Sequence, residues 1–558
     1  MKSTFTRTLG MLALAAGLST FSTSCTKDLD QTPTYSANAE VVYSDPAQIE
    51  QVLARLYATF AVSGQQGPSG QPDISGIDEG FSNYLRQYWQ LQELTTDEAV
   101  LGWNDGNLPA VNYLTWNADN EFVRATYDRI YYEISLCNEF IRQTSDDNLA
   151  KRGISGATAN TVRTYRSEAR LLRALSYWHV VDMFGGGPFP TEANSIGTNP
   201  QYGTRDQLFS YVEDELLKLD ALDVNSGKLL APRQVYARAD QGVLWTLLTK
   251  LYLNAPVYTV NAQSTSTVAN SGVGFYTLAA RYAANVLGAG YQLCTTASSQ
   301  YSAYQKLFLA DNNSSDARNE IIFPITFDGT RTTSYGGMTY LVRAAVGGSI
   351  QPASVGINGG WGGTRARQQL SNLLATNTSS TDARRAILYT AGQNLNVASL
   401  PTYSDGYLLP KYKNVTSAGA AGSDATGNFP DTDFPMFRLA DVKLMYAEAL
   451  LRSGGTGTAG TPLQQVNDVR LRAGSPALTT VTVDDILDER GRELYWEGHR
   501  RTDLIRFGKY VSNYNWALKG GAQFPNGTDV PGYRRVFPLP NTDIVANPNL
   551  RGHQNTGY

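Results

Sequence analysis

The sequence predicts a mostly α-helical protein. Apolar residues recur with helical spacing in many segments, one segment begins with a helix-capping motif, and glycines end others. The candidate helices cover residues 46–60, 121–142, 162–184, 205–219, 239–253, 278–287, 438–452, 462–472 and 483–497. Surface loops rich in glycine and serine are expected at residues 64–80, 261–274 and 417–428.

The segment 162–184 gives a clear amphipathic pattern. Leu171, Leu175 and Trp178 fall on one side of the expected helix. Gly185 follows at the position where a left-handed residue ends many helices. The segment is therefore expected to be a core helix.

A charged helix is expected at residues 483–497. Thr482 and Asp485 have the spacing of a capping box, in which each residue bonds the other's backbone N–H. Glutamates four positions apart repel each other unless basic groups fold against them. This row consists of Glu489, Glu493 and Glu497. The arginines expected to neutralise it are Arg490, Arg500, Arg501 and Arg506.

Composition and charge exclude several classes of function. Hydrophobic residues make up 42% of the chain and charged residues 17%, so the chain can bury a large core. The net charge of -4, with basic and acidic residues interspersed, gives no electrostatic footprint for nucleic acid. Only Cys137 and Cys294 follow Cys25, so no disulfide framework is expected, and Cys137 is predicted to be a buried, inert thiol.

The sequence offers little for catalysis. Its three histidines are His179, His499 and His553, and neither a zinc-binding His-Glu-x-x-His motif nor a nucleophile elbow is present. We therefore expect no catalytic residue, no metal site and no cofactor. Glu493, Glu497 and His499 have the chemistry of an acid/base group, but the neighbouring arginines favour a structural ion network.

The N-terminus has the features of a lipoprotein signal peptide, expected at residues 1–24. Lys2 and Arg7 precede a short apolar run at 9–18, and Cys25 follows small residues. A membrane-spanning helix needs about 20 apolar residues, so the run is too short to be one. Cys25 is the expected site of lipid attachment. The alternative is a plain secretory signal with an incidental cysteine.

Aromatic residues next to glycines and amides stand out in the expected loops. The chain contains 33 tyrosines and 8 tryptophans, and the clearest clusters are residues 102–107, 334–340 and 358–363. The apolar C–H face of a pyranose packs on an indole or phenol ring, and amides bond its hydroxyls. Such loops therefore favour sugar binding. The tryptophans expected in the core instead are Trp89, Trp116, Trp178, Trp245 and Trp496.

Several segments together resemble one known family. They are residues 168–190, 438–455, 484–509 and 536–550. Their motifs are similar to those of the SusD/RagB family, surface nutrient-binding lipoproteins that sit on TonB-dependent transporters. The resemblance spans nearly the whole chain that follows the signal peptide.

This resemblance implies a fold and a division of the chain. The expected fold is mostly α, with degenerate tetratricopeptide-like helical repeats as a scaffold and a looped, mixed second region packed on it. Residues 25–330 would form the N-terminal region with the repeats, and residues 331–558 the C-terminal region.

The resemblance also implies a binding site. By similarity to the family's starch-binding members, Trp103, Tyr335 and Trp361 would form a stacking platform. Residues 93–106 resemble the family's N-terminal ligand loop. The hydrogen-bonding candidates are Arg86, Asn104, Asp105 and Asn107.

The function implied is capture of oligosaccharides at the cell surface, with α-glucan or starch as the first choice. The protein would be anchored in outer-membrane lipid through Cys25 and would deliver its ligand to a SusC-like, TonB-dependent barrel. Lys27, Asp28 and Asp30 resemble the charged signal that exports such lipoproteins to the cell surface.

Two alternatives remain open at this level. The same scaffold can capture peptides or another nutrient, which a charged groove poor in exposed tryptophan would favour. A glycosidase would need two carboxylates facing each other across a cleft, roughly 5 to 9.5 Å apart. No spacing in the sequence indicates such a pair.

Overall fold

The computed structural model describes residues 39–68 and 70–558. Contacts between residues divide the chain into two units, Met1–Ile49 and Glu50–Tyr558. The second unit holds every candidate site residue except the lipid-attachment residue. Cys25 lies outside the described residues, as do the rest of the expected signal peptide and the export residues that follow it.

Helices account for most of the regular structure in the described residues. The α-helices are α2 (Ala39–Ser44), α3 (Pro46–Ala61), α4 (Tyr84–Trp89), α5 (Leu108–Tyr113), α6 (Glu121–Gln143), α7 (Asp146–Lys151), α8 (Gly156–Met183), α9 (Arg205–Asp220), α10 (Gln241–Leu253), α11 (Ala255–Tyr258), α12 (Phe275–Leu287), α13 (Ala303–Lys306), α14 (Gly337–Ala344), α15 (Gln368–Ala375), α16 (Leu439–Ser453), α17 (Pro462–Arg472), α18 (Val483–Leu494), α19 (Arg500–Arg506) and α20 (Asn541–Ala546). The strands are β1 (Ala99–Leu101), β2 (Gly187–Pro188), β3 (Tyr202–Gly203), β4 (Ile321–Ile325), β5 (Thr364–Ala366) and β6 (Phe434–Arg438), which pair as β1 with β5, β2 with β3 and β4 with β6.

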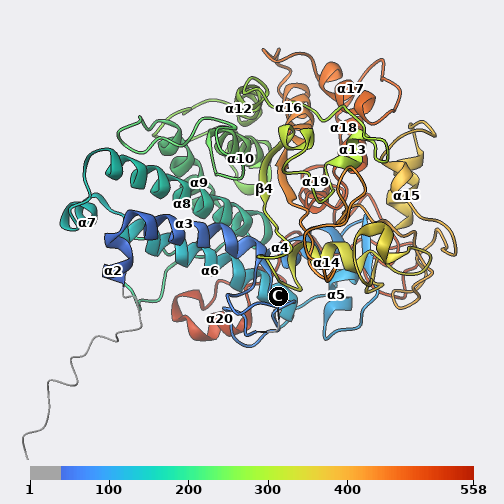
Figure 1. Cartoon of the computed structure of the whole chain (residues 1–558), viewed down its shortest axis with the longest axis horizontal. Coiled ribbons are helices and arrows are strands. Elements are labelled where there is room, and N and C mark those ends of the chain that lie inside the picture. The colour runs from blue at the N-terminus through green and yellow to red at the C-terminus, as the bar shows by residue number, and fades with distance from the viewer. Residues whose placement is uncertain (1–38, 69) are drawn as a thin grey trace, which may run out of the picture. The chain divides into compact units, whose positions relative to one another are not determined.

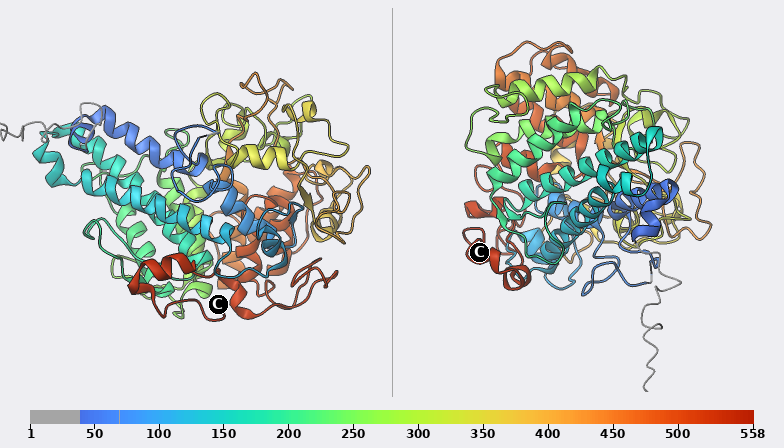
Figure 2. Two further views of the ribbon diagram at one scale, coloured as in Figure 1. Left: turned by 90° about the horizontal axis from the view of Figure 1, so that it is seen from below. Right: turned by 90° about the vertical axis from the view of Figure 1, so that its left-hand side faces the viewer.

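Long helices pack side by side to form the scaffold (Figure 1). Helix α6 packs on α8, α8 on α9 and α9 on α10, so successive helices are neighbours in space. Helix α10 packs on α12, and α12 on α16, which lies far along the chain. Figure 2 shows these helices from two further sides. Between α14 and β6 the chain is mostly loop. The prediction of a mostly helical scaffold with a looped second region is confirmed.

Helix α8 ends as the sequence predicts. Leu171, Leu175 and Trp178 are buried on one face. Gly185, just beyond the helix, has a φ of 76° in the left-handed region. The helix begins at Gly156, earlier than expected, because its first turns are mostly polar and lie near the surface, where apolar periodicity gives no signal.

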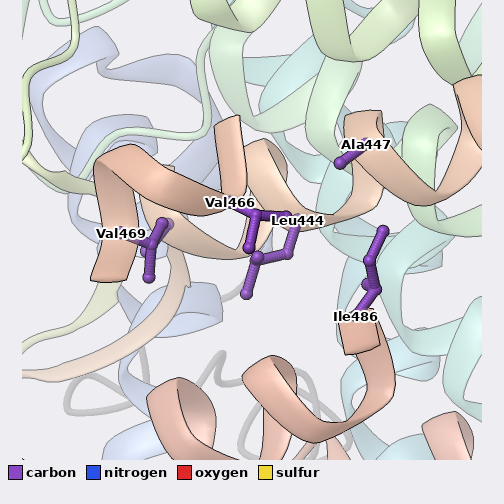
Figure 3. Close-up of a cluster of buried hydrophobic side chains, with 6 residues drawn as sticks. Leu444, Ala447, Val466, Val469 and Ile486 are labelled. Atoms are coloured by element: carbon purple, nitrogen blue, oxygen red, sulfur yellow. The ribbon is translucent and has the colours of Figure 1, made fainter. Parts of the chain in front are cut away.

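Helices α16, α17 and α18 share a buried apolar cluster (Figure 3). It contains Leu444 and Ala447 of α16, Val466 and Val469 of α17, and Ile486 of α18, all fully buried. Burying a Val, Leu or Ile side chain contributes about 1.5 to 3 kcal/mol. The cluster therefore holds the C-terminal helices in place.

Helix α18 begins as predicted but ends sooner. Thr482 and Asp485 form the capping box. The helix stops before Glu497, because the chain turns at Trp496, whose φ is 62°. Trp496 is buried edge-on against Trp89, whose Nε1 donates to the Trp496 carbonyl at 2.9 Å. Glu497 therefore lies beyond the helical row.

The glutamates do pair with basic groups, and the network is buried. The partners are Arg384, Arg470 and Arg492 for Glu489; Arg384, Arg438 and Arg472 for Glu493; and Lys411 and Arg438 for Glu497. His499 is also buried, and burial lowers its pKa to about 3. The group is a structural ion network, as the sequence favours.

The arginines expected to neutralise this row pair elsewhere, so that prediction is wrong. Arg490 pairs with Asp441 and Asp503, Arg500 with Asp97, Arg501 with Asp182 and Arg506 with Glu448. Adjacent positions on a helix do not face each other, so Arg490 projects away from Glu489. The other three lie past the turn that ends α18.

Most of the predicted core residues are buried. Trp89, Trp116, Trp178 and Trp496 are buried, and the free thiol of Cys137 is buried too. Trp245 is only half-buried, so its assignment to the core is wrong. Its Nε1 donates to a carboxylate oxygen of Asp220 at 2.8 Å, so the polar edge of the indole finds a partner near the surface.

Candidate functional site

Strand pairing brings two distant loops together. Strands β1 and β5 run antiparallel, and the ladder continues where Gly102 N donates to the Gly363 carbonyl at 3.1 Å. Trp103 follows β1 and Trp361 precedes β5, so both leave the ladder at the same end. Residues far apart in the sequence therefore become neighbours.

Backbone contacts fix the loop that carries Trp361. Its N–H donates to the carbonyl of Arg343, near the end of α14, at 2.8 Å. A Cβ at Gly363 would lie 2.5 Å from Nε1 of Trp103, which is closer than side chains approach. Glycine at this position lets the indole lie against the backbone of the second loop.

Trp103, Trp361 and Tyr335 form a continuous set of rings, here called the aromatic row. The Trp103 and Trp361 ring centroids are 6.2 Å apart with planes inclined by 55°. Tyr335 follows at 6.3 Å from Trp361, inclined by 57°. Tyr335 is 38% exposed and both tryptophans are half-buried. The three rings predicted as a platform thus lie together and are partly exposed to solvent.

A buried carboxylate positions Tyr335. Glu79 accepts hydrogen bonds from Ser334 Oγ at 2.6 Å and from Tyr335 N at 3.2 Å. Burial raises the pKa of Glu79. This carboxylate therefore braces the loop that carries Tyr335.

Arg86 is buried next to Trp103. Its side chain is 3% exposed, with the guanidinium carbon 5.8 Å from the Trp103 ring and 4.4 Å from the Tyr340 ring. Burial lowers its pKa to about 10, and its Nε and Nη2 have no hydrogen-bond partner in the described part of the chain. Arg86 packs against Trp103 and Tyr340, and its expected hydrogen bond to a ligand stays a prediction.

Arg343 packs against the ring of Trp361. The guanidinium carbon lies 5.5 Å from that ring. Its Nη2 donates to the side-chain oxygen of Asn358 at 2.7 Å, and its Nη1 to the Gly427 carbonyl at 3.1 Å. Arg343 thus connects the row to a further loop.

The amide candidates beyond Trp103 have different surroundings. Asn104 and Asp105 are exposed beside the Trp103 end of the row. The side-chain oxygen of Asn107 instead accepts from the N–H of Glu121 at 3.1 Å. Asn107 therefore ties the loop to the start of α6, and its carbonyl oxygen is already used in the fold.

The segment that leads to Trp103 is anchored by the turn after α18. Glu93 accepts from Gly498 N at 2.5 Å, and Glu98 from Trp496 N at 3.0 Å. Arg500 binds Asp97 through two nitrogens, each at 2.8 Å. Burial raises the pKa of Glu98 to about 7 and the pKa of Glu93 well above its usual range.

Sequence reasoning missed two important residues, Arg343 and Phe429. The Phe429 centroid lies 5.6 Å from that of Tyr335. Nothing in the local pattern separates either residue from the rest of its segment. Asn358, by contrast, stands at the head of the glycine-rich cluster that contains Trp361.

Two features are absent from the described residues. No group of three or more His, Cys, Asp or Glu side chains is arranged there to hold a metal ion. None of the described helices is both long and apolar enough to cross a bilayer.

The sequence matches one known protein family. The model of the SusD family matches residues 252–558. The chain is similar to the starch-binding protein SusD of Bacteroides thetaiotaomicron, with 34% identity over 100% of both chains. It is also similar to a SusD-like protein of Bacteroides ovatus, with 23% identity over 97% of this chain and 96% of the other.

Solved structures share the fold. Surface glycan-binding protein A of Bacteroides thetaiotaomicron, in complex with laminarihexaose, superposes with a TM-score of 0.63 at 18% identity, over 91% of this chain and 99% of that one. The corresponding protein of Bacteroides fluxus gives 0.65 at 18% identity, over 92% and 99%.

Proposed function

This chain belongs to the SusD family, and from that premise we propose that it is a non-catalytic surface protein that captures glycans. The observation that carries the proposal is the aromatic row. Three rings from three separate loops gather with partly open faces, which a core does not require. Pyranose C–H groups pack on such faces.

The ring angles favour a curved ligand. Successive planes of the row are inclined by 55° and 57°, so the rings do not form a flat shelf. A glucan whose linkages turn the chain follows such a surface better than a flat, extended chain. An α-linked glucan is our first choice, supported by the similarity to a starch-binding protein.

Support for a non-catalytic role comes from the carboxylates. Glu79 braces Tyr335, and Glu93, Glu98 and Asp97 anchor the loop to buried partners. These carboxylates are bonded to groups of the protein itself, so their role is structural. Three of the four similar proteins reported above are named for binding, and none has the name of an enzyme.

The anchor and the transporter complete the proposal. Cys25 would carry the lipid that holds the protein on the outer membrane, facing outward. The ligand would pass to a SusC-like, TonB-dependent barrel. Residues 25–330 and 331–558 would be the two regions of the mature protein.

The lipid-free protein should bind amylopectin or another soluble α-glucan without releasing reducing ends. A platform of partly open rings buries little of a short ligand, so Kd should be roughly micromolar to millimolar. Affinity electrophoresis and a glycan array measure binding, and a reducing-end assay measures hydrolysis. The double variant Trp103→Ala, Trp361→Ala is the control. Steady product formation by homogeneous protein would contradict the non-catalytic role.

A further inference from the structure

We propose that the row continues into a fourth sugar subsite, formed by the ring of Phe429 and the amide of Asn428. This inference rests on the proposed glycan binding and extends it to ligand length. Phe429 is half-buried, and its ring is inclined by 43° to that of Tyr335 at 5.6 Å. Tyr335 therefore has ring contacts with both Trp361 and Phe429.

The loop that carries this subsite is fixed in advance. A carboxylate oxygen of Asp424 accepts from the N–H groups of Asn428 at 2.9 Å and Phe429 at 3.0 Å. Arg343 donates to the Gly427 carbonyl at 3.1 Å, and Asn358 donates to the Thr426 carbonyl at 2.8 Å. Because the loop is already ordered, a ligand loses little free energy in ordering it.

The amide of Asn428 has bonding capacity left for a sugar. Its Oδ1 accepts from Asn358 at 2.8 Å, and its Nδ2 donates to Thr426 Oγ1 at 2.9 Å. A side-chain amide has two N–H groups and two acceptor lone pairs. Within the described residues, one N–H group and one acceptor lone pair of the Asn428 amide are therefore unused. A neighbouring donor and acceptor suit the paired hydroxyls of one pyranose.

A fourth subsite makes affinity depend on the length of the oligosaccharide. Short oligosaccharides fill the rings of Trp103, Trp361 and Tyr335, and only a longer chain reaches Phe429. Affinity should thus keep rising with chain length until this subsite is occupied.

The test is a binding series from maltose to maltoheptaose, measured by calorimetry on the lipid-free chain. Phe429→Ala should lower the affinity for maltoheptaose about 5- to 10-fold and leave the affinity for maltotriose unchanged. Phe429→Trp should restore the long-chain affinity. The matched control is Phe524→Ala. Phe524 is a different phenylalanine, 37% exposed, and its removal should change neither the affinity for maltoheptaose nor the affinity for maltotriose.

The other outcomes distinguish failure of the fourth subsite from failure of the proposed function. If Phe429→Ala weakens every length equally, the ring only supports Tyr335 and the subsite is refuted. Equal affinities of variant and wild type at all lengths also refute it, while the proposed function stands. If the wild type itself binds no member of the maltose series and no laminari-oligosaccharide, the proposed function fails. Thermal melting of each variant shows that it is folded.

Discussion

Single residues decide how the ligand loop approaches the scaffold. Gly106 has a φ of 47°, and a Cβ there would collide with the carboxylate of Glu121. The side-chain oxygen of Asn107, the next residue, accepts a hydrogen bond from the N–H of Glu121 at the start of α6. A side chain at Gly106 would have to displace the carboxylate of Glu121. Asn104 and Asp105, which are exposed, stay the predicted hydrogen-bonding groups at this end of the row.

The tryptophans of the row should behave differently from a core tryptophan. Trp103→Ala and Trp361→Ala should each weaken glycan binding by about 1 to 3 kcal/mol, because each removes an apolar contact with the sugar. Trp178→Ala should cost about 3 to 5 kcal/mol of stability, because it leaves a cavity on the buried face of α8.

Calorimetric titration and thermal unfolding of the three variants separate these effects. Row variants that unfold as readily as Trp178→Ala would place those rings in the core. Folded row variants that bind normally would mean that the glycan lies elsewhere.

At the scale of elements, a carboxyl pair joins the ligand loop to the turn after α18. The Oε2 of Glu93 is buried and has no hydrogen-bond partner in the described residues unless it carries a proton. Glu98 is its neighbour, and burial followed by the Glu98 charge raises the pKa of Glu93. A proton on Glu93 that is shared with Glu98 satisfies both groups.

This pair should make stability depend on pH. Both pKa values are raised on folding, so the folded state holds more protons than the unfolded state above about pH 4.5. The stabilisation is full below that pH and is lost as pH rises through about 7, the folded value for Glu98. Glu93→Gln keeps a donor at this position without titrating, so it should flatten part of the decline.

Urea unfolding at several pH values between 5 and 8 measures this effect. Burial also raises the pKa of Glu133 and of Asp433 to about 7 in each case, so part of the decline should persist in the variant. Glu133→Gln is the positive control, because it removes a buried carboxyl with a raised pKa away from the ligand loop and should itself flatten part of the decline. An unchanged slope in Glu93→Gln would rule out the shared proton.

At the scale of the whole molecule, the buried ion network connects segments from the loops and the helices. Arg384 comes from the loop region, Arg438 from the end of β6 and Glu493 from α18. Removing one member of a buried pair leaves an unpaired charge and commonly costs about 3 to 5 kcal/mol. The network therefore fixes the looped region on the scaffold, and the row depends on that region.

The anchor can be tested on the whole protein. Cys25→Ala should release the protein from the outer membrane and leave its fold intact, since that cysteine precedes all of the described helices and is expected only to carry lipid. Detergent partitioning and circular dichroism measure the two properties. A variant that stays in the detergent phase would contradict lipid attachment at this residue.

The sequence by itself determined the long helices and the kind of residue expected at the site, but short helices such as α14, α15 and α19 were not predicted. Apolar periodicity is local, so α8, α16 and α17 are visible in it, and so are the aromatic clusters around Trp103 and Trp361. Only the tertiary structure decided which groups meet. The partners of Glu489 and the contact of Phe429 with Tyr335 join segments far apart in the chain. Local spacing carries no signal for such contacts, because strand pairing and burial across the whole fold create them.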